Sequence, residues 1–477
     1  MATANFTVPL LINGKEVRTS TTFPVVSPST SETVWSSSSA SKDEALQAVS
    51  AAEAALPAWS KSKPNFRRDI ILRAGVLFEK RTSECQEYMM KETGAAESFS
   101  QFNTDTTAEM FRDIAGKIGL ALQGEIPVCQ QEGTSALVLK EPYGVVLGIA
   151  PWNAPYILGL RAMIYALAAG NTVVFKGSEL SPRCFHVLGQ VLMEAGLPAG
   201  ALNMIYHKPQ DAAEITAALI EHPAVKKVNF TGSTGVGSII AGLSGKHLKP
   251  CLMELGGKAS AIVCSDADIS KAGLQCALGA FLHSGQICMS TERILVHSSI
   301  ISEFRTALKG AITQVFPAHT PAVLIASAGV EKNKKLIEDA VSKGAKVIHG
   351  DHKIEESSKT RMAPIVVEGV KDHMDLFHTE SFGPSVSLIP FETEEEAVKM
   401  ANDTEYGLSG AIFTESLGRG LRMAKQIESG AIHINSMSVR DEPGLPHGGV
   451  KKSGWGRFNS TWGLHEFLRT KTITFQE

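Results

Sequence analysis

The sequence predicts an α/β protein of at least two domains, built on doubly wound parallel sheets. From about residue 143 onward, short apolar runs alternate with helical stretches at the spacing of βαβ units. Several of these runs are apolar along their whole length, as strands covered by helices on both faces are. The chain has 477 residues, more than the roughly 250 to 300 at which a single core stops growing, so more than one domain is expected.

Composition and charge are those of an ordinary globular protein. Hydrophobic residues make up 43% of the chain, charged residues 20%, and the net charge is -3, which favours neither a nucleic acid nor an anionic membrane as partner. Residues 1–14 lack the basic and apolar regions of a secretory signal. The longest apolar stretch, 156–170, contains Arg161 and is shorter than the roughly 20 residues of a membrane span.

The cysteines predict neither a metal site nor a disulfide framework. Seven are present, and no two of them have CxxC spacing. Disulfides form in oxidising compartments. The expected setting is therefore the reducing cytoplasm, with no metal bound.

Turn and capping signals define the elements near the N-terminus. Residues 10–17 read as a hairpin of two strands with Asn13 and Gly14 as its turn. The serine-rich run that follows ends at Ser41, and Glu44 stands three residues later, the spacing of a capping box that opens an alanine-rich helix. A second capping box is expected at 393–396.

Two series of strands and helices follow. The first has strands at 144–150, 171–176, 202–207 and 225–232, with helices at 153–170, 182–196 and 212–222 between them. The second has strands at 259–264, 293–297, 345–350 and 385–391, with helices ending near Leu282 and Ala311. Two α/β units joined near "ELGGK" at 254–258 are the simplest division, and a cleft between domains is the favoured place for an active site.

A glycine cluster, "NFTGSTGVG" at 229–237, lies between a strand and a helix. Backbone amides at such a helix N-terminus favour a phosphate. The spacing is not GxGxxG, and no clear acidic residue follows about 20 residues later. Dinucleotide binding and a plain tight turn both remain open here.

Lys176 and Glu179 follow the carboxyl end of a buried strand, where open α/β sheets bind ligands. Lysine there can bind ribose hydroxyls, while glutamate would accept from the 2′-hydroxyl and repel a 2′-phosphate. A solvated loop pair is the alternative. Together with the glycine turn, the pair favours NAD over NADP.

Three further residues have side chains suited to chemistry. Asn153 can donate to an oxyanion or cap the helix that follows it. Arg161 lies in a helix otherwise too apolar to be exposed, so it needs a buried partner or a polar cavity. Glu254 follows an apolar run that would raise its pKa and suit it to act as a base, unless it pairs with Lys258.

Cys288 lies in "FLHSGQICMS", where Ser284 and Gly285 interrupt an apolar helix. One cysteine and one base can support aldehyde oxidation or acyl transfer. Core packing is the alternative for any single cysteine. Two later segments, "HTESFGP" and "PHGGVKKSGWGRF", read in isolation as a turn and a glycine-rich loop.

These motifs together resemble the aldehyde dehydrogenase superfamily. "PWNAP", "VVFKGSEL", "FTGSTGVG", "MELGGK", "GQIC", "ESFGP" and "PHGGVKKSGWGR" occur in the order and spacing of that family and span nearly the whole chain. The resemblance implies a Rossmann-type NAD-binding domain at 1–120 and 142–255 and an α/β catalytic domain at 256–455. It also implies a small β oligomerisation element at 121–141 and 456–477, and a homodimer or homotetramer.

The resemblance also implies roles for single residues. Cys288 matches the nucleophile, Glu254 the base that activates the deacylating water, and Asn153, with the Cys288 amide, the oxyanion hole. The positions implied at the cofactor are Ala150, Pro151, Trp152, Lys176, Glu179, Gly232, Ser233, Val236, Leu255, Gly256, Glu380 and Phe382. Those implied at the aldehyde are Tyr156, Arg161, Leu282, Ile287, Asp441 and His447.

Departures from the usual family pattern bear on the substrate. His283 stands where Asn is usual, His447 where Phe is frequent, and Phe458 where Glu is common; 316–335 lacks the usual "GDP" and "GPLI" wording. The substrate set is more polar than an aromatic box, and it is most similar to the branch that oxidises salicylaldehyde and vanillin. We expect a hydroxylated aromatic aldehyde, with Arg161 or His447 addressing a ring substituent.

Three alternatives to this reading remain. One is an aldehyde dehydrogenase of broad or aliphatic specificity. Another is an acylating member that passes the thioester to coenzyme A, against which the presence of Glu254 argues. The third is a non-catalytic NAD-binding relative, which would be expected to have lost Cys288 or Glu254; both are present.

Overall fold

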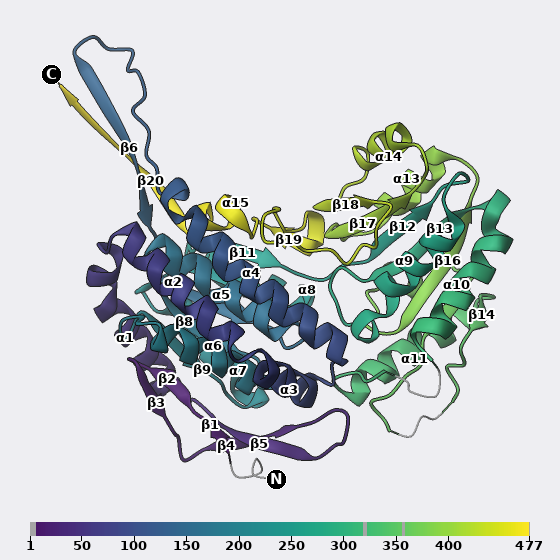
Figure 1. Ribbon diagram of the computed structural model, residues 1–477, viewed down its shortest axis with the longest axis horizontal. Coiled ribbons are helices and arrows are strands. Elements are labelled where there is room, and N and C mark those ends of the chain that lie inside the picture. The colour runs from purple at the N-terminus through teal and green to yellow at the C-terminus, as the bar shows by residue number, and fades with distance from the viewer. Residues whose placement is uncertain (1–5, 318–321, 355–357, 477) are drawn as a thin grey trace.

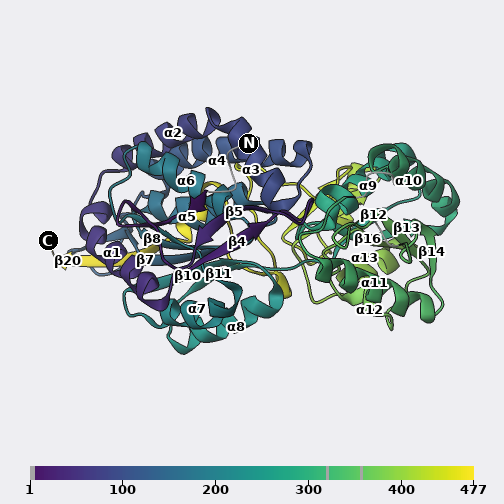
Figure 2. The same cartoon turned by 90° about the horizontal axis from the view of Figure 1, so that it is seen from below.

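Two large sheets, each covered by helices, form two lobes that lie side by side (Figures 1 and 2). The computed structural model describes residues 6–317, 322–354 and 358–476. Parts of two segments discussed above, 318–321 within 316–335 and Glu477 at the terminal strand, lie outside the described residues. The chain crosses from the first sheet to the second between Glu254 and Ala259.

The first sheet has eight strands in the order β19-β11-β10-β7-β8-β9-β2-β3. Its strands are β2 (Leu10–Ile12), β3 (Lys15–Val17), β7 (Val145–Ala150), β8 (Thr172–Gly177), β9 (Leu202–Ile205), β10 (Val225–Thr231), β11 (Cys251–Glu254) and β19 (Gly454–Trp455). The five strands β7 to β11 pair in parallel, as expected for βαβ units, whereas β2, β3 and β19 pair antiparallel.

Helices cover both faces of the first sheet, which is why β7 is buried along its whole length and β8 is buried except at Lys176 (Figure 2). The helices are α1 (Lys42–Ser60), α2 (Pro64–Glu79), α3 (Thr82–Thr93), α4 (Glu97–Ala121), α5 (Pro155–Ala169), α6 (Pro182–Glu194), α7 (Ala212–Glu221), α8 (Thr234–Lys246) and α15 (Ser460–His465). Helix α5 is buried on every side, because it lies between the sheet and α2, α4 and α6.

The second sheet has seven strands in the order β14-β15-β16-β13-β12-β17-β18, all parallel except β14. Its strands are β12 (Ala259–Val263), β13 (Thr291–His297), β14 (Lys346–His349), β15 (Ile365–Glu368), β16 (Ser385–Phe391), β17 (Ser409–Phe413) and β18 (Ala431–Ile434). Its helices are α9 (Ile269–Phe281), α10 (Ile301–Val315), α11 (Ser327–Ser342), α12 (Asp375–His378), α13 (Glu394–Asn402) and α14 (Leu417–Ala424). One apolar cluster packs α9 and α10 on one face, and another packs α11 to α14 on the opposite face.

Two smaller sheets complete the fold. Strands β1 (Thr7–Val8), β5 (Thr33–Ser38) and β4 (Thr22–Val26) form one of them. Strands β6 (Thr134–Pro142) and β20 (Leu468–Gln476) form the other, a nine-residue antiparallel ladder that projects away from both lobes (Figure 1).

Local sequence signals explain several boundaries. The predicted hairpin is confirmed, with Asn13 and Gly14 both at positive φ. The capping box of α1 is also confirmed. At α13, Thr393 caps the Glu396 amide, but Glu396 accepts from the amide of Glu392, so only half of that box forms.

Two short elements lie in other parts of the fold than the predicted domain limits assign them to. Residues 454–455, placed by sequence at the end of the catalytic domain, form β19 and pair with β11 of the first sheet. Helix α15, placed in the oligomerisation element, packs on α4 and α5 of the first lobe. Both short elements lack a periodic pattern, so sequence alone gave no reason to attach them there.

Candidate active site

A cavity of about 260 Å³ opens where the carboxyl ends of β7 and β10 face the loop that carries Glu380 and Phe382. It is lined by Pro151, Trp152, Asn153, Leu158, Thr231, Gly232, Ser233, Leu255, Gly256, Cys288, Lys332, Glu380 and Phe382. Nine of these were predicted from sequence as catalytic or cofactor residues, besides Cys288. Leu158, Thr231 and Lys332 were not predicted.

The glycine turn lies at this cavity. β10 ends at Thr231, α8 begins at Thr234, and no side chain caps the first amides of α8. These free amides and the apolar wall of Leu255 and Trp152 suit the phosphates and rings of a dinucleotide. The donor set therefore fits a nicotinamide dinucleotide. Val236, also predicted at the cofactor, lies half-exposed on α8.

Lys176 and Glu179 lie at the end of β8, beside β7, but do not line the cavity. Burial lowers the pKa of Lys176 to about 8, against the opposing charge of Glu179. Ala150 ends β7 and leads directly into Pro151 and Trp152. The carboxyl ends of the parallel strands β10, β7 and β8 thus lie at one edge of the sheet.

Cys288 lies after a sharp break in the backbone. Helix α9 ends at Phe281, and a short turn follows in which His283, Ser284 and Gly285 all have positive φ. A Cβ at Gly285 would lie 2.2 Å from the Gly383 carbonyl oxygen, so no other residue fits there. The predicted reading of this break is confirmed: the helix stops, and Cys288 reaches the cavity.

The thiol of Cys288 donates to Glu254 Oε1 at 3.3 Å. Burial and the neighbouring carboxylates Glu254 and Glu380 raise the pKa of this thiol well above its usual range. The proton of the pair therefore rests on sulfur, not on Glu254. Cysteine reacts as the thiolate, but at rest this site favours the neutral thiol.

The prediction of a raised pKa for Glu254 is wrong. Burial raises it, but His447 and Arg161 outweigh burial and leave the pKa of Glu254 below its usual value. His447 Nε2 lies 3.0 Å from Oε1, and Arg161 lies 3.9 Å from Oε2. Lys258, the partner considered from sequence, pairs with Glu292 instead. The apolar strand gave no sign of these two neighbours, His447 and Arg161, which are distant in sequence.

Asn153 is buried and donates its amide to the Gln286 carbonyl at 2.9 Å, two residues from Cys288. It does not cap α5, whose N-cap is Ala154. The capping alternative is therefore wrong. The amide lies against the nucleophile loop and lines the cavity.

None of the six residues predicted at the substrate lines this cavity. Tyr156 is fully buried and donates to the Cys85 carbonyl, while Leu282 and Ile287 flank the Cys288 turn. Arg161 donates to Asp441 Oδ2 at 2.5 Å and to Asn459 at 3.0 Å. Arg161 thus has the buried partner that its position required.

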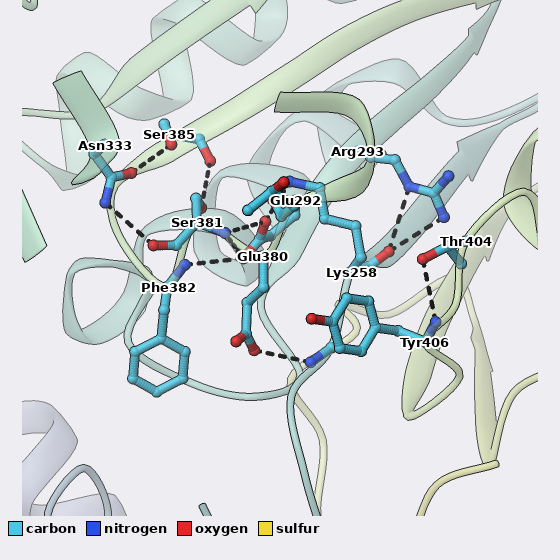
Figure 3. Close-up of polar contacts among 12 residues, drawn as sticks. Lys258, Glu292, Arg293, Asn333, Glu380, Ser381, Phe382, Ser385, Thr404 and Tyr406 are labelled. Carbon is cyan, nitrogen blue, oxygen red and sulfur yellow. Dashed lines mark hydrogen bonds and ion pairs between the residues drawn. The ribbon is translucent and has the colours of Figure 1, made fainter. Parts of the chain in front are cut away.

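A buried network holds the loop of Glu380 and Phe382 (Figure 3). Glu292 accepts from the amides of Ser381 and Phe382 and from Lys258 Nζ. The Glu380 and Phe382 side chains extend from the side of the loop opposite Asn333 and Ser385 (Figure 3). Glu380 accepts from the Gly257 amide at 2.8 Å, and burial raises its pKa to about 7. Sequence analysis missed Glu292, although a charged residue inside an apolar strand was a usable signal.

His283, unexplained by the sequence, stacks on Phe99 of α4 with ring centroids 4.6 Å apart and planes at 15°. Burial lowers its pKa to about 3, so the ring is neutral. Within 6–317, 322–354 and 358–476, no helix is long and apolar enough to cross a membrane, and no group of three or more metal-ligating side chains gathers.

Comparison with known proteins gives the family. The aldehyde dehydrogenase family model matches residues 16–473. A vanillin dehydrogenase of Pseudomonas fluorescens is 44% identical, with 98% of each chain covered. A salicylaldehyde dehydrogenase of Pseudomonas putida G7, solved with salicylaldehyde, is 37% identical over 99% of this chain and 98% of that one, with a TM-score of 0.95. A betaine aldehyde dehydrogenase of Staphylococcus aureus, solved with NAD+, is 29% identical over 98% of this chain and 94% of that one, with a TM-score of 0.92. The chain belongs to the aldehyde dehydrogenase family.

Proposed function

We propose that this enzyme oxidises an aromatic aldehyde, hydroxylated as in salicylaldehyde or vanillin, to the carboxylic acid with NAD. The observation that carries the chemistry is the contact of the Cys288 thiol with Glu254 at the edge of the cavity. A nucleophile and a base in hydrogen-bond reach are what covalent catalysis requires. The aromatic substrate is supported by the relatives named for vanillin and salicylaldehyde.

The residues act in a fixed order. Glu254 takes the thiol proton as sulfur attacks the aldehyde carbon, and Asn153 with the Cys288 amide donates to the oxyanion, worth about 3 to 4 kcal/mol per donor. A nicotinamide dinucleotide held beside Trp152, Glu380 and Phe382 would supply the acceptor for the hydride of the substrate carbon. Glu254 then takes a proton from water, which attacks the thioester, and sulfur leaves as the acid forms.

NAD is the favoured cofactor because of Glu179. Its carboxylate lies at the end of β8, next to Lys176, where the adenosine ribose of a dinucleotide is expected. A 2′-phosphate there would be repelled. Trp152, Glu380 and Phe382 line the opposite part of the site, where the nicotinamide and its ribose are expected.

A panel assay tests substrate and cofactor together. Salicylaldehyde, vanillin, benzaldehyde and hexanal are each assayed with NAD and with NADP. The proposal expects the two hydroxylated aromatic aldehydes and NAD to give the highest kcat/KM. Equal or better turnover of hexanal would overturn the aromatic assignment and favour the broad or aliphatic alternative.

Arg161 and His447 were expected to address a ring substituent. Both side chains contact carboxylates, so a role at the ring would require Arg161 to contact substrate while paired with Asp441. Replacing Arg161 by Met should then raise KM for salicylaldehyde more than for benzaldehyde. An equal change in both values would point to a structural role instead.

We further propose a cytoplasmic homodimer or homotetramer, assembled through β6 and β20. This ladder carries the exposed apolar side chains Leu139, Ile473 and Phe475, which a monomer would leave in water. All seven cysteines are free, in keeping with a reducing compartment.

A further inference from the structure

His447 makes a contact that its position in the sequence did not suggest. Its Nε2 lies 3.0 Å from Glu254 Oε1, the same oxygen that accepts from the Cys288 thiol. The backbone of His447 is fixed by two hydrogen bonds with Phe458, and its side chain is 8% exposed. The contact is therefore part of the site and not a chance approach of a surface side chain.

The number of protons that Glu254 must take up in one cycle indicates a role for this contact. Glu254 takes one proton from the Cys288 thiol before the sulfur attacks, because the resting proton lies on sulfur. It must take another from water before the thioester is hydrolysed. One carboxylate holds one proton, so Glu254 has to be emptied between the two steps. The side chain of Glu254 is 1% exposed, and solvent therefore has little direct access to it.

Among the residues that the structure describes, one side chain in contact with Glu254 can receive that proton. The side chains that contact the Glu254 carboxylate are Cys288, Arg161 and His447. At that stage Cys288 is bound as the thioester, and arginine has donors but no acceptor. Imidazole can both donate and accept through Nε2, depending on its tautomer. His447, with a side chain 8% exposed, also lies nearer to water than Glu254 does.

Groups of both charges lie around His447. Asp441 interacts with the ring electrostatically, and its carboxylate has a pKa lowered to about 2; burial opposes this, while Arg161 and His447 favour ionisation. His433 faces the same region, and burial together with Arg440 and His447 lowers its pKa. His447 thus lies next to the Glu254 carboxylate and close to the buried pair of Arg161 and Asp441.

We propose that His447 is the outlet through which Glu254 loses the thiol proton between acylation and deacylation. The proposal rests on the proposed function, since it assigns a step to the same Cys288 and Glu254. In acylation the S–H bond breaks, the S–C bond forms and the hydride with its two electrons passes to NAD, while the thiol proton passes from Glu254 to Nε2 of the Nδ1–H tautomer and the ring then loses a proton to water. The second proton of the cycle leaves with the carboxylic acid after deacylation. His447 acts through Glu254 and is a positioning and relay residue, not a catalytic one.

Stopped-flow mixing separates hydride transfer from proton release. The enzyme is mixed with NAD and the aldehyde that the wild type oxidises fastest; NADH reports hydride transfer, and a pH-indicator dye reports proton release. In the wild type, proton release should keep pace with NADH formation. H447Q keeps a donor to Glu254 but cannot relay a proton, so NADH should form in a first turnover while proton release lags and kcat falls about tenfold or more. Proton release that keeps pace with NADH in H447Q, at the wild-type kcat, would overturn the proposal.

Further variants separate relay from folding. H186Q is the matched control, because His186 is another buried histidine with its Nε2 3.2 Å from a carboxylate, Glu16, far from the site in sequence; it should leave both signals unchanged. H447A leaves a space that added imidazole can fill, so imidazole should restore proton release, whereas H447F should not respond. If H447Q and H447F slow NADH and proton release equally, with no lag and no rescue of H447A, His447 only supports the site and the proposal fails.

A cofactor-free readout completes the test. Hydrolysis of 4-nitrophenyl acetate without NAD passes through an acetyl thioester on Cys288, so the burst of 4-nitrophenolate reports acylation and the later rate reports deacylation. H447Q should keep the burst and slow the later rate; an unchanged later rate would contradict the relay. Failure of the proposed function is seen separately, as a wild type that forms no NADH with aromatic aldehydes.

Discussion

At the scale of residues, the charge on Glu254 decides how the site works. His447 and Arg161 hold its pKa low, while burial and Glu254 itself hold the pKa of Cys288 high. The resting site is thus a thiol beside a carboxylate. Glu254 has to take a proton from the thiol and later from water, so its replacement should slow both acylation and deacylation.

Replacing Glu254 by Gln should therefore lower kcat by about 10² to 10⁴-fold, the usual range for a general base. It should also slow alkylation of Cys288 by iodoacetamide at neutral pH, because no carboxylate takes the thiol proton. The matched control is E16Q, which removes another carboxylate that faces a histidine. Unchanged alkylation in E254Q would show that the thiol is activated elsewhere.

His283 predicts a dependence of stability on acid. Its pKa is about 3 in the folded protein, against 6.5 for a free side chain, because burial disfavours the charged ring. The folded value is the lower one, so the stabilisation is complete above about pH 6.5 and is lost as pH falls toward 3. Near pH 5 the loss amounts to about 2 kcal/mol.

Melting temperatures at pH 8 and pH 5 test this. Between pH 8 and pH 5, the melting temperature of H283N should fall by less than that of the wild type. Loss of the stacking on Phe99 can lower the melting temperature of H283N at both pH values without changing this difference. An equal loss in the two proteins would mean that other groups set the acid sensitivity.

At the scale of elements, Glu292 of β13 determines where the Glu380 loop lies. It accepts from the amides of Ser381 and Phe382 and from Lys258 (Figure 3), and both Glu292 and Lys258 are buried. E292Q would leave Lys258 without its charge partner, a buried charge that is costly to leave unpaired. The expected result is a raised KM for NAD with Cys288 alkylation unchanged. E368Q, which removes a partly exposed carboxylate from the same sheet, should raise KM for NAD much less than E292Q does.

The buried pair of Arg161 and Asp441 joins α5 to the segment after β18. D441N should destabilise the protein by about 3 kcal/mol, since the one carboxylate that Arg161 then contacts among the described residues is the more distant Glu254. E442Q, next in sequence, removes an exposed ion pair with Arg440 and should change the melting temperature little. A similar fall in melting temperature in D441N and E442Q would show that the buried pair stabilises the protein no more than the exposed pair does.

Elements with local signals could be predicted, and contacts between distant segments could not. The alternation from 144 to 232 places β7 to β10 within a few residues, because strand and helix periods are local. Helices α2 to α4 were missed, and α4 buries Asn103, Thr104 and Thr107, which blur its apolar stripe. The contact of His447 with Glu254 joins residues 193 apart, and no pattern within either segment contains it.

At the scale of the whole molecule, the ladder of β6 and β20 is the part that a single chain leaves unsupported (Figure 1). Ile473 and Phe475 are 41% and 47% exposed. Replacing both by Lys should lower the mass measured by light scattering to that of one chain or one smaller assembly, because charges would have to be buried at the interface. An unchanged mass would place the interface elsewhere, for instance on α8 and the turn after it, where Ile239 and Leu248 are exposed.

The central claim is that oxidation passes through a thioester on Cys288. The most direct measurement is the mass of the Cys288 peptide from enzyme quenched in acid during turnover of salicylaldehyde with NAD. The account predicts an added acyl group on that peptide, absent without NAD and absent in C288A, which should form no NADH above background. Aldehyde oxidation by C288A at the wild-type rate, or an acyl group on another cysteine alone, would contradict it.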